Sequence, residues 1–251
     1  MEIAVTLEGV TKRFGDLVAV EEVSFSAGGE IFGIIGNNGA GKSTLFQMIV
    51  GLLRPDAGRI TRFGGKGGDP RAQIGYLPEK TLLYPRLTPW EFLDFVARIR
   101  GIPAPPIDEE LERFHLRTHR DDLIEGLSFG MRRKVGLIAA MLGAPPLVIL
   151  DEPLNGLDVE SMDLVEARLR EIVGGGRSVL FSSHYLDFAE RICDRVAVLR
   201  RGRLLACDTP AALREAYGKA SLLEIFRMFH RKDAPHGNVV PAPQPFPPPP
   251  E

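Results

Sequence analysis

Residues 36–43 read Gly-Asn-Asn-Gly-Ala-Gly-Lys-Ser, which fits the phosphate-binding pattern G-x-x-x-x-G-K-[S/T]. Glycines let backbone N–H groups turn inward around an anion, and a helix that begins at the end of the loop adds partial positive charge. Lys42 would then hold the β- and γ-phosphates of a nucleotide, while the Ser43 hydroxyl would ligate Mg²⁺. The predicted nucleotide-binding residues of this loop are Gly36, Asn37, Asn38, Gly39, Ala40, Gly41, Lys42, Ser43 and Thr44.

An acidic pair, Asp151-Glu152, follows directly after the apolar run Leu147–Leu150. A strand that is buried on both faces presents its first polar residues at the C-terminal edge of the sheet, where ligands bind in open α/β folds. Asp151 is therefore a candidate to bind Mg²⁺ through water, and Glu152 is a candidate to polarise an attacking water. The pair alone also fits a solvated strand end, but the phosphate loop upstream favours the catalytic interpretation.

The segments around these residues alternate between short aliphatic runs and longer helical patterns, which predicts an α/β fold. A helix is expected over Lys42–Val50, directly after the phosphate loop. Residues near the N-terminus alternate between apolar and polar, as one-sided antiparallel strands do. The expected strands are 3–8 and 22–26 near the N-terminus, 31–35, 147–150 and 178–182 in the core, and a closing hairpin of 195–199 and 203–206.

Strand signals vanish between about residues 79 and 141, which predicts a helical insert in the α/β core. Thr88-Pro89-Trp90-Glu91 has the features of a helix start, because Thr88 can cap, proline fits the first turn, and Glu91 can close a capping box. This helix should run to Arg100. A second is expected over 108–114, and a third begins near Gly130.

Composition narrows the class of protein. The chain has 251 residues, is 44% hydrophobic and carries a formal charge of −2, without the basic excess of a nucleic-acid binder. Its longest apolar runs are far shorter than the roughly 20 residues that cross a bilayer. The N-terminus has no basic segment followed by an apolar core, so no signal peptide is expected. Two cysteines, Cys193 and Cys207, form neither a disulfide framework nor a metal cluster.

Four further segments stand in a fixed order around the phosphate loop and the acidic pair. They are Phe14, Leu127-Ser-Phe-Gly-Met131, Asn155-Gly-Leu-Asp158 and Ser182-Ser-His184. With them the sequence resembles the ABC ATPase family over about residues 3–225. In that family the corresponding elements are the aromatic residue that stacks on adenine, the LSGGQ signature motif, the D-loop and the switch histidine.

The resemblance implies how these residues act. Two ATPase domains would close head-to-tail on two ATP molecules, so that Ser128 and Gly130 contact the γ-phosphate bound by the other subunit. His184 would sense the γ-phosphate and help to position water. Asp158, in the D-loop, would join the two sites. The second domain could be an identical copy or a different ABC subunit.

Two positions depart from the family pattern. Glu79 stands where many members have the Q-loop glutamine that ligates Mg²⁺, and a carboxylate can do the same. Phe129 replaces the first glycine of the signature pair. Because Ser128 and Gly130 remain, we expect a working signature motif, with a weakened site in a heterodimer as the alternative.

The resemblance predicts a transport ATPase, with residues 74–79, 154–158 and 182–196 most similar to exporters of the drug and antibiotic type. Integral membrane subunits would be separate chains, and this subunit would be cytoplasmic and peripheral on the inner face of the cell membrane. Residues 1–232 would form the ATPase domain, and the Pro-rich residues 233–251 a disordered tail, with partner docking a weaker alternative.

Three other functions remain as alternatives. The first is a soluble ABC ATPase of a cytosolic assembly pathway. A degenerate subunit that binds ATP without turning it over is disfavoured, because Lys42, Asp151, Glu152 and His184 are all present. A P-loop kinase would leave the signature motif and the D-loop unexplained.

Overall fold

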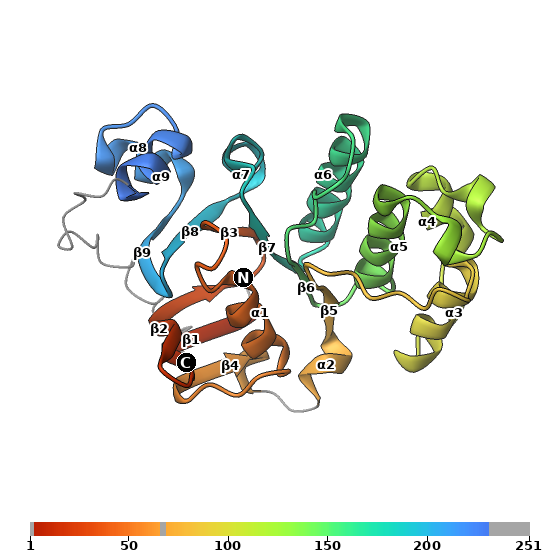
Figure 1. Cartoon of the computed structure of the whole chain (residues 1–251), viewed down its shortest axis with the longest axis horizontal. Coiled ribbons are helices and arrows are strands. Elements are labelled where there is room, and N and C mark those ends of the chain that lie inside the picture. Colours follow the sequence, from red (N-terminus) through yellow and green to blue (C-terminus); the bar gives the residue numbers. More distant parts are fainter. Residues whose placement is uncertain (1–2, 66–68, 231–251) are drawn as a thin grey trace.

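Two β-sheets carry most of the apolar runs in the structure, a computed structural model that describes residues 3–65 and 69–230 (Figure 1). The larger sheet has the strand order β5-β6-β7-β3-β8-β9, and the smaller has the order β2-β1-β4. The strands are β1 Val5–Phe14, β2 Leu17–Ala27, β3 Ile31–Ile35, β4 Ala57–Arg62, β5 Ile74–Leu77, β6 Leu147–Leu150, β7 Ser178–Ser183, β8 Arg195–Arg200 and β9 Arg203–Asp208. The predicted tail, 233–251, lies outside the described residues.

Helices cover the larger sheet and form a separate end of the molecule, on the right of Figure 1. The helices are α1 Lys42–Val50, α2 Pro70–Gln73, α3 Pro89–Ile99, α4 Ile107–Arg113, α5 Phe129–Met141, α6 Val159–Gly174, α7 Leu186–Ile192, α8 Pro210–Tyr217 and α9 Leu222–His230, with short 3-10 turns at Phe63–Gly65, Arg117–His119 and Ile124–Gly126. Among the described residues, no helix combines the length and apolar character needed to span a membrane.

The strands of the larger sheet from β5 to β8 are parallel, and β9 closes it antiparallel to β8. All residues of β3, β6 and β7 are buried, as expected of strands covered on both faces. Alternate side chains enter two cores: Ile31 and Ile35 pack among α5, α6 and α7, while Phe32 and Ile34 pack with α1 and the smaller sheet. Since the strands are parallel, the phosphate loop, the acidic pair and His184 follow strand ends at the same edge.

The smaller sheet confirms the predicted antiparallel pairing near the N-terminus, with β1 between β2 and β4. Both predicted strands are longer in the structure than their alternation indicated, because bulges interrupt the register of β1. Strand β4 escaped prediction, since Ala57-Gly-Arg-Ile-Thr-Arg62 contains only one large apolar residue and lies at the sheet edge with no buried position.

The helical insert is confirmed as a run of α3, α4 and α5 without strands. Helix α3 begins as predicted: the Glu91 N–H donates to Thr88 Oγ1 at 3.2 Å, and the Thr88 N–H donates to Glu91 Oε2 at 2.9 Å. The insert is tied to the core through α4 and α6. Arg113 donates to both oxygens of Glu171 at 2.7 and 2.8 Å, and Arg168 donates to the buried Glu110 at 2.7 Å.

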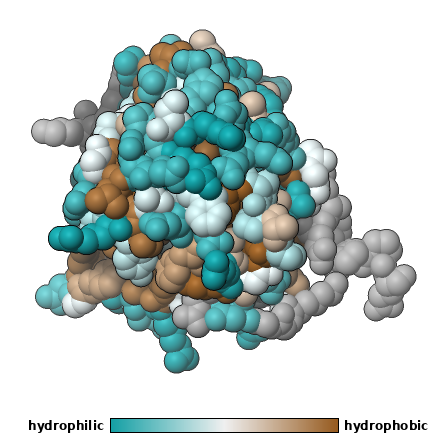
Figure 2. Space-filling view, turned by 90° about the vertical axis from the view of Figure 1, so that its right-hand side faces the viewer, coloured by the Kyte–Doolittle hydropathy of each residue, from teal (hydrophilic) through white to brown (hydrophobic). Residues whose placement is uncertain are grey.

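Apolar side chains also reach the surface of this helical end. Figure 2 looks onto it and shows brown patches between the polar residues. Several large apolar residues of the insert are exposed: Leu82, Tyr84, Phe95, Ile99 and Leu123. Leu82 is 87% exposed, the largest fraction among these five residues.

The capping box at α3 yields a stability prediction. Thr88→Ala should lower the free energy of unfolding by about 1 kcal/mol, because alanine lacks the Oγ1 that accepts from the Glu91 N–H and keeps only the backbone N–H that donates to Glu91. Chemical denaturation followed by circular dichroism measures the change. Thr88→Ser is the matched control, since serine keeps the capping hydroxyl. Equal destabilisation by both substitutions would show that the methyl group, and not the cap, matters here.

Candidate nucleotide-binding site

The loop between β3 and α1 can only be built with glycine at two of its positions. Gly41 has a φ of 105°, and a Cβ there would lie 2.4 Å from the Ala19 carbonyl oxygen. At Gly36, a Cβ would lie 2.6 Å from the Leu199 carbonyl oxygen. These contacts press the loop against β2 and the end of β8, and they leave its backbone wrapped over the start of α1.

A cavity of about 590 Å³ lies on this loop and collects most of the predicted nucleotide-binding residues. Its lining is Phe14, Leu17, Val18, Ala19, Asn38, Gly39, Ala40, Gly41, Lys42, Ser43, Thr44, Glu79, Glu152 and Arg201. Gly36 and Asn37 lie behind the cavity and contribute carbonyl oxygens that accept hydrogen bonds from Lys42. Phe14 stands at the rim, 47% exposed, with Lys12 Nζ 5.6 Å from the centre of its ring.

Lys42 is almost fully buried, and its ammonium group is held from three sides. It donates to the carbonyl oxygens of Gly36 at 2.8 Å and Asn37 at 3.3 Å. Its third neighbour is the carboxylate of Glu152, whose Oε1 lies 3.1 Å from Nζ. Lys42 and Glu152 are 110 positions apart in the sequence, so this ion pair joins the phosphate loop directly to the acidic pair.

Glu152 is fixed by residues from the next strand. Its backbone has a φ of 51°, in the left-handed region that a non-glycine residue rarely adopts. Its N–H donates to Ser182 Oγ at 2.8 Å, and His184 Nδ1 lies 2.7 Å from Oε2. Oε1 is buried without a hydrogen-bond partner in the described part of the chain. This oxygen is the one that faces Lys42.

The signature and D-loop residues do not line the cavity. Ser128 caps α5 by accepting from the Met131 N–H, and Asp158 caps α6 by accepting from the Ser161 N–H. The two segments touch each other: a Cβ on Gly156 would lie 2.3 Å from the Phe129 ring. A single chain therefore brings together Lys42, Glu152 and His184, and leaves Ser128, Gly130 and Asp158 facing elsewhere.

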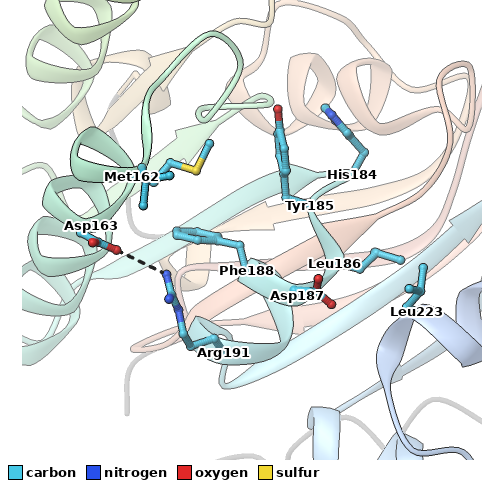
Figure 3. Close-up of a pocket in the computed structure, with 10 residues that line it drawn as sticks. Met162, Asp163, His184, Tyr185, Leu186, Asp187, Phe188, Arg191 and Leu223 are labelled. Carbon is cyan, nitrogen blue, oxygen red and sulfur yellow. Dashed lines mark ion pairs between the residues drawn. The ribbon is translucent and has the colours of Figure 1, made fainter.

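His184 also lines a second cavity of about 570 Å³, shown in Figure 3. The cavity lies between α6, α7 and the start of α9, with Met162 and Phe188 inside it. Arg191 lies 3.7 Å from Asp163 and stacks on the Phe188 ring at 5.4 Å. His184 and Tyr185 stand at its upper rim in this view, so the histidine connects this cavity to Glu152.

Comparison with known proteins agrees with this geometry. Residues 20–155 match the family model described as ABC transporter. The Nod factor export ATP-binding protein I of Rhizobium sp. (strain N33) is 38% identical over 234 residues, which cover 90% of this chain and 77% of that protein. The protein of the same name from Bradyrhizobium diazoefficiens is 37% identical, over 89% and 76% of the two chains. The chain belongs to the ABC transporter family.

A solved structure of the ATP-binding subunit of an ABC transporter has the same fold. Its TM-score is 0.85 at 32% identity, over 91% of this chain and all of that one. The present chain is thus an ATP-binding subunit of an ABC transporter and an ATPase, as predicted. The alternative of an ABC ATPase in an assembly pathway finds no support in these matches.

Several residues of this ABC subunit's site were not predicted from the sequence. Leu17, Val18 and Ala19 reach the cavity from the start of β2, and Arg201 reaches it from the β8–β9 turn. Ser182 hydrogen-bonds to both acidic residues, through Glu152 N–H and Asp151 Oδ1. Ser182 belonged to the motif that identified His184, but small hydroxyl residues at strand ends are too common to single out.

Asp151 is the most deeply buried acid of the site. Its Oδ1 accepts from the Ser182 hydroxyl at 2.6 Å, whereas its Oδ2 is buried without a hydrogen-bond partner among the described residues. Burial raises the pKa of Asp151, the hydroxyls of Ser182 and Ser43 oppose the shift, and the charges of Glu79 and Glu152 add to it. The described residues around Asp151 therefore do not fully stabilise its carboxylate charge.

Asp151→Asn should accordingly stabilise the nucleotide-free protein at neutral pH, raising Tm by about 2–4 °C. Because the pKa is raised in the folded state, the charge destabilises the fold above that pKa. The penalty disappears as the pH falls towards the ordinary value of 3.8, and the gain of the variant should shrink with it. Thermal unfolding between pH 4 and 8 measures the difference from wild type.

Asp56→Asn is a control of opposite sign. The N–H of Arg13 and the ammonium of Lys12 lower the pKa of Asp56, so its charge stabilises the fold above pH 3.8. This variant should lose stability at neutral pH, and the loss should fade on acidification. A neutral-pH Tm for Asp151→Asn below that of wild type would show that the Asp151 charge is stabilising.

Proposed function

We propose that this ABC subunit binds Mg²⁺-ATP at the phosphate loop and hydrolyses it to drive export through separate membrane subunits. The observation that supports this most directly is the placement of Lys42, Glu152 and His184 in one hydrogen-bonded and ionic cluster at the cavity. A subunit that only bound ATP would not require a carboxylate there. In this proposal residues 1–232 form the ATPase unit, with its helical part at about 79–141.

ATP binding would use the residues that line the cavity. Phe14 offers an exposed ring face for adenine at the rim, beyond the phosphate loop. Inward N–H groups of residues 36–44 and the N-terminus of α1 provide partial positive charge for the phosphates. Lys42 lies beside this loop and would exchange its contact with Glu152 for the β- and γ-phosphates.

The residues present fit a bound Mg²⁺. Asp151 Oδ2 is a buried oxygen without a partner among the described residues, and Ser43 and Glu79 line the adjoining cavity. No cluster of three metal-binding side chains occurs in residues 3–65 and 69–230. A few oxygen ligands from the protein suit Mg²⁺ in nucleotide sites, where phosphates and waters supply most of the ligands. The ion, held by Ser43, Asp151 and Glu79, would neutralise charge on the phosphates.

Hydrolysis would depend on Glu152 and His184. Glu152 Oε1 would accept a hydrogen bond from the attacking water, and eventually its proton, once Lys42 has moved to the phosphates. His184 holds the other carboxylate oxygen at 2.7 Å and thereby orients the base towards the γ-phosphate. The bond from the β,γ-bridging oxygen to the γ-phosphorus breaks as the bond to the water oxygen forms, and ADP and phosphate leave.

Export through membrane subunits is supported by two observations. The relatives are named as Nod factor export ATP-binding proteins, which favours the export direction. The helical end exposes apolar side chains of residues 82–99 beside the segment that carries Glu79. A cytoplasmic helix of the membrane subunit could pack on such a surface, which would place this subunit on the inner face of the membrane.

Two copies of the subunit would close on ATP. Phosphate loop and signature motif lie apart in one chain, so each site needs a signature motif from a second subunit. A two-fold arrangement satisfies both sites at once. Ser128 and Gly130 at the N-terminus of α5 would meet the partner's γ-phosphate, while Asp158 would lie between the two sites.

Substitution at the cluster tests the catalytic proposal. Glu152→Gln should retain ATP binding and lower kcat by about 10²–10⁴, because glutamine cannot take the proton. Lys42→Ala should abolish tight ATP binding. Phosphate release and fluorescent-nucleotide binding measure the two effects. Asp187→Asn, on the first turn of α7 and outside the lining of the cavity at the phosphate loop, is the control. A Glu152→Gln variant that turns over normally would remove Glu152 from this role.

Light scattering tests the dimer. Glu152→Gln protein should shift from monomer to dimer when Mg²⁺-ATP is added, because ATP binds the dimer more tightly and is not hydrolysed. Adding Ser128→Arg to Glu152→Gln should prevent the shift by placing a bulky side chain at the signature motif. A monomer under all conditions would reject self-pairing and favour a different ABC subunit as partner.

A further inference from the structure

Arg133 is the largest fully buried side chain in the described part of the chain, only 1% exposed. It lies on α5, little more than one turn after the Ser128 cap. A charged residue is rarely buried to this degree unless its hydrogen bonds are satisfied. This role could not be predicted from the sequence, because a run such as Arg132-Arg133-Lys134 is also typical of a solvated helix face.

The guanidinium group donates hydrogen bonds to two segments of the site, one through Nη1 and the other through Nη2. Its Nη1 donates to the carbonyl oxygens of Pro78 and Glu79, both at 2.9 Å, and to Thr81 Oγ1 at 2.7 Å. Its Nη2 donates to the carbonyl oxygens of Asp151 at 2.5 Å and Glu152 at 2.7 Å. Only a planar fork can serve both segments at once, so lysine could not replace it.

All of these acceptors except Thr81 are backbone carbonyls. Arg133 therefore fixes the chain at Glu79, Asp151 and Glu152 through their backbone and does not use their carboxylates. Burial lowers the pKa of Arg133, and the charges of Asp151, Glu152 and Glu79 oppose the shift. Arginine keeps its proton in proteins, so a permanent positive charge lies among three acids.

We propose that Arg133 is a positioning residue that clamps the backbone of Glu79 to that of the acidic pair and joins both to the signature helix. It holds the carbonyl of Glu152, whose left-handed φ of 51° needs support from its surroundings. Because the clamp sits on α5, contact of the signature motif with a partner's nucleotide would reach the subunit's own Glu152. This inference rests on the catalytic role proposed above for Glu152.

Arg133→Met tests the clamp in the full chain, because methionine preserves much of the volume and removes every donor. We expect kcat to fall about 10²-fold, while the Kd for a fluorescent ATP analogue changes by less than about threefold. Arg133→Lys should remain at least about tenfold impaired, since charge alone cannot hold both segments. A loss of kcat without loss of binding separates positioning from general damage to the fold.

Arg100→Met is the matched control. Arg100 is half-buried and, like Arg133, donates to backbone: its acceptor is Ala139 O, near the other end of α5, at 2.7 Å. It should lower Tm but leave kcat within about twofold of wild type. Should Arg133→Met fail to fold, Thr81→Val carries the test: it removes one acceptor of the fork, and kcat should fall about threefold or more at unchanged Kd.

The outcomes separate this inference from the proposed function. The clamp alone would be overturned if Thr81→Val and either Arg133→Met or Arg133→Lys, each as a single variant, kept the wild-type kcat. It would also be overturned if Arg100→Met lowered kcat as much as Arg133→Met does. If the wild-type protein shows no ATPase activity that is lost in Lys42→Ala, the proposed function is overturned, and the clamp with it.

Discussion

Four charged side chains lie buried together at one edge of the parallel sheet, and the surrounding segments must supply their hydrogen-bond partners. Lys42, Arg133, Asp151 and Glu152 are all nearly inaccessible, and an isolated charge in such a place would cost several kcal/mol. Carbonyls of the phosphate loop accept from Lys42, and carbonyls at the ends of β5 and β6 accept from Arg133. The hydroxyl of Ser182 in β7 donates to Asp151, and the histidine after β7 contacts Glu152. Parallel strands make this convergence feasible, because their C-terminal ends open onto one edge.

Hydrophobic periodicity and motif spacing predicted most of the fold. Strands β3 and β6 and helix α1 were predicted to the residue, since fully apolar runs between Gly-rich or acidic boundaries leave few alternatives. Strand β4 was not, because an edge strand needs little apolar surface and its pairing comes from β1, far away in the sequence. The bulges in β1 likewise arise from its pairing with β2, so the alternation of β1 alone does not show where the strand ends.

The candidate site was predictable where chemistry demands a rare residue and not where it uses a common one. Lys42, Asp151 and Glu152 follow from the phosphate loop and from a strand that ends in acids. Arg133 and Ser182 act through hydrogen bonds to backbone, and no local pattern distinguishes such residues. Phe129, an anomaly in the signature motif, packs on Gly156 of the D-loop, so the substitution creates a contact within the subunit.

The ion pair between Lys42 and Glu152 bears on how ATP would bind to this subunit. Oε1 of the Glu152 carboxylate lies 3.1 Å from the ammonium group that a phosphate would need in the proposed function. Under the proposed mechanism the carboxylate would thus be an intramolecular competitor of the substrate, and part of the free energy of ATP binding would go into displacing it. Displacement would free the carboxylate for the attacking water as the phosphates arrive, so that general-base catalysis would follow nucleotide binding.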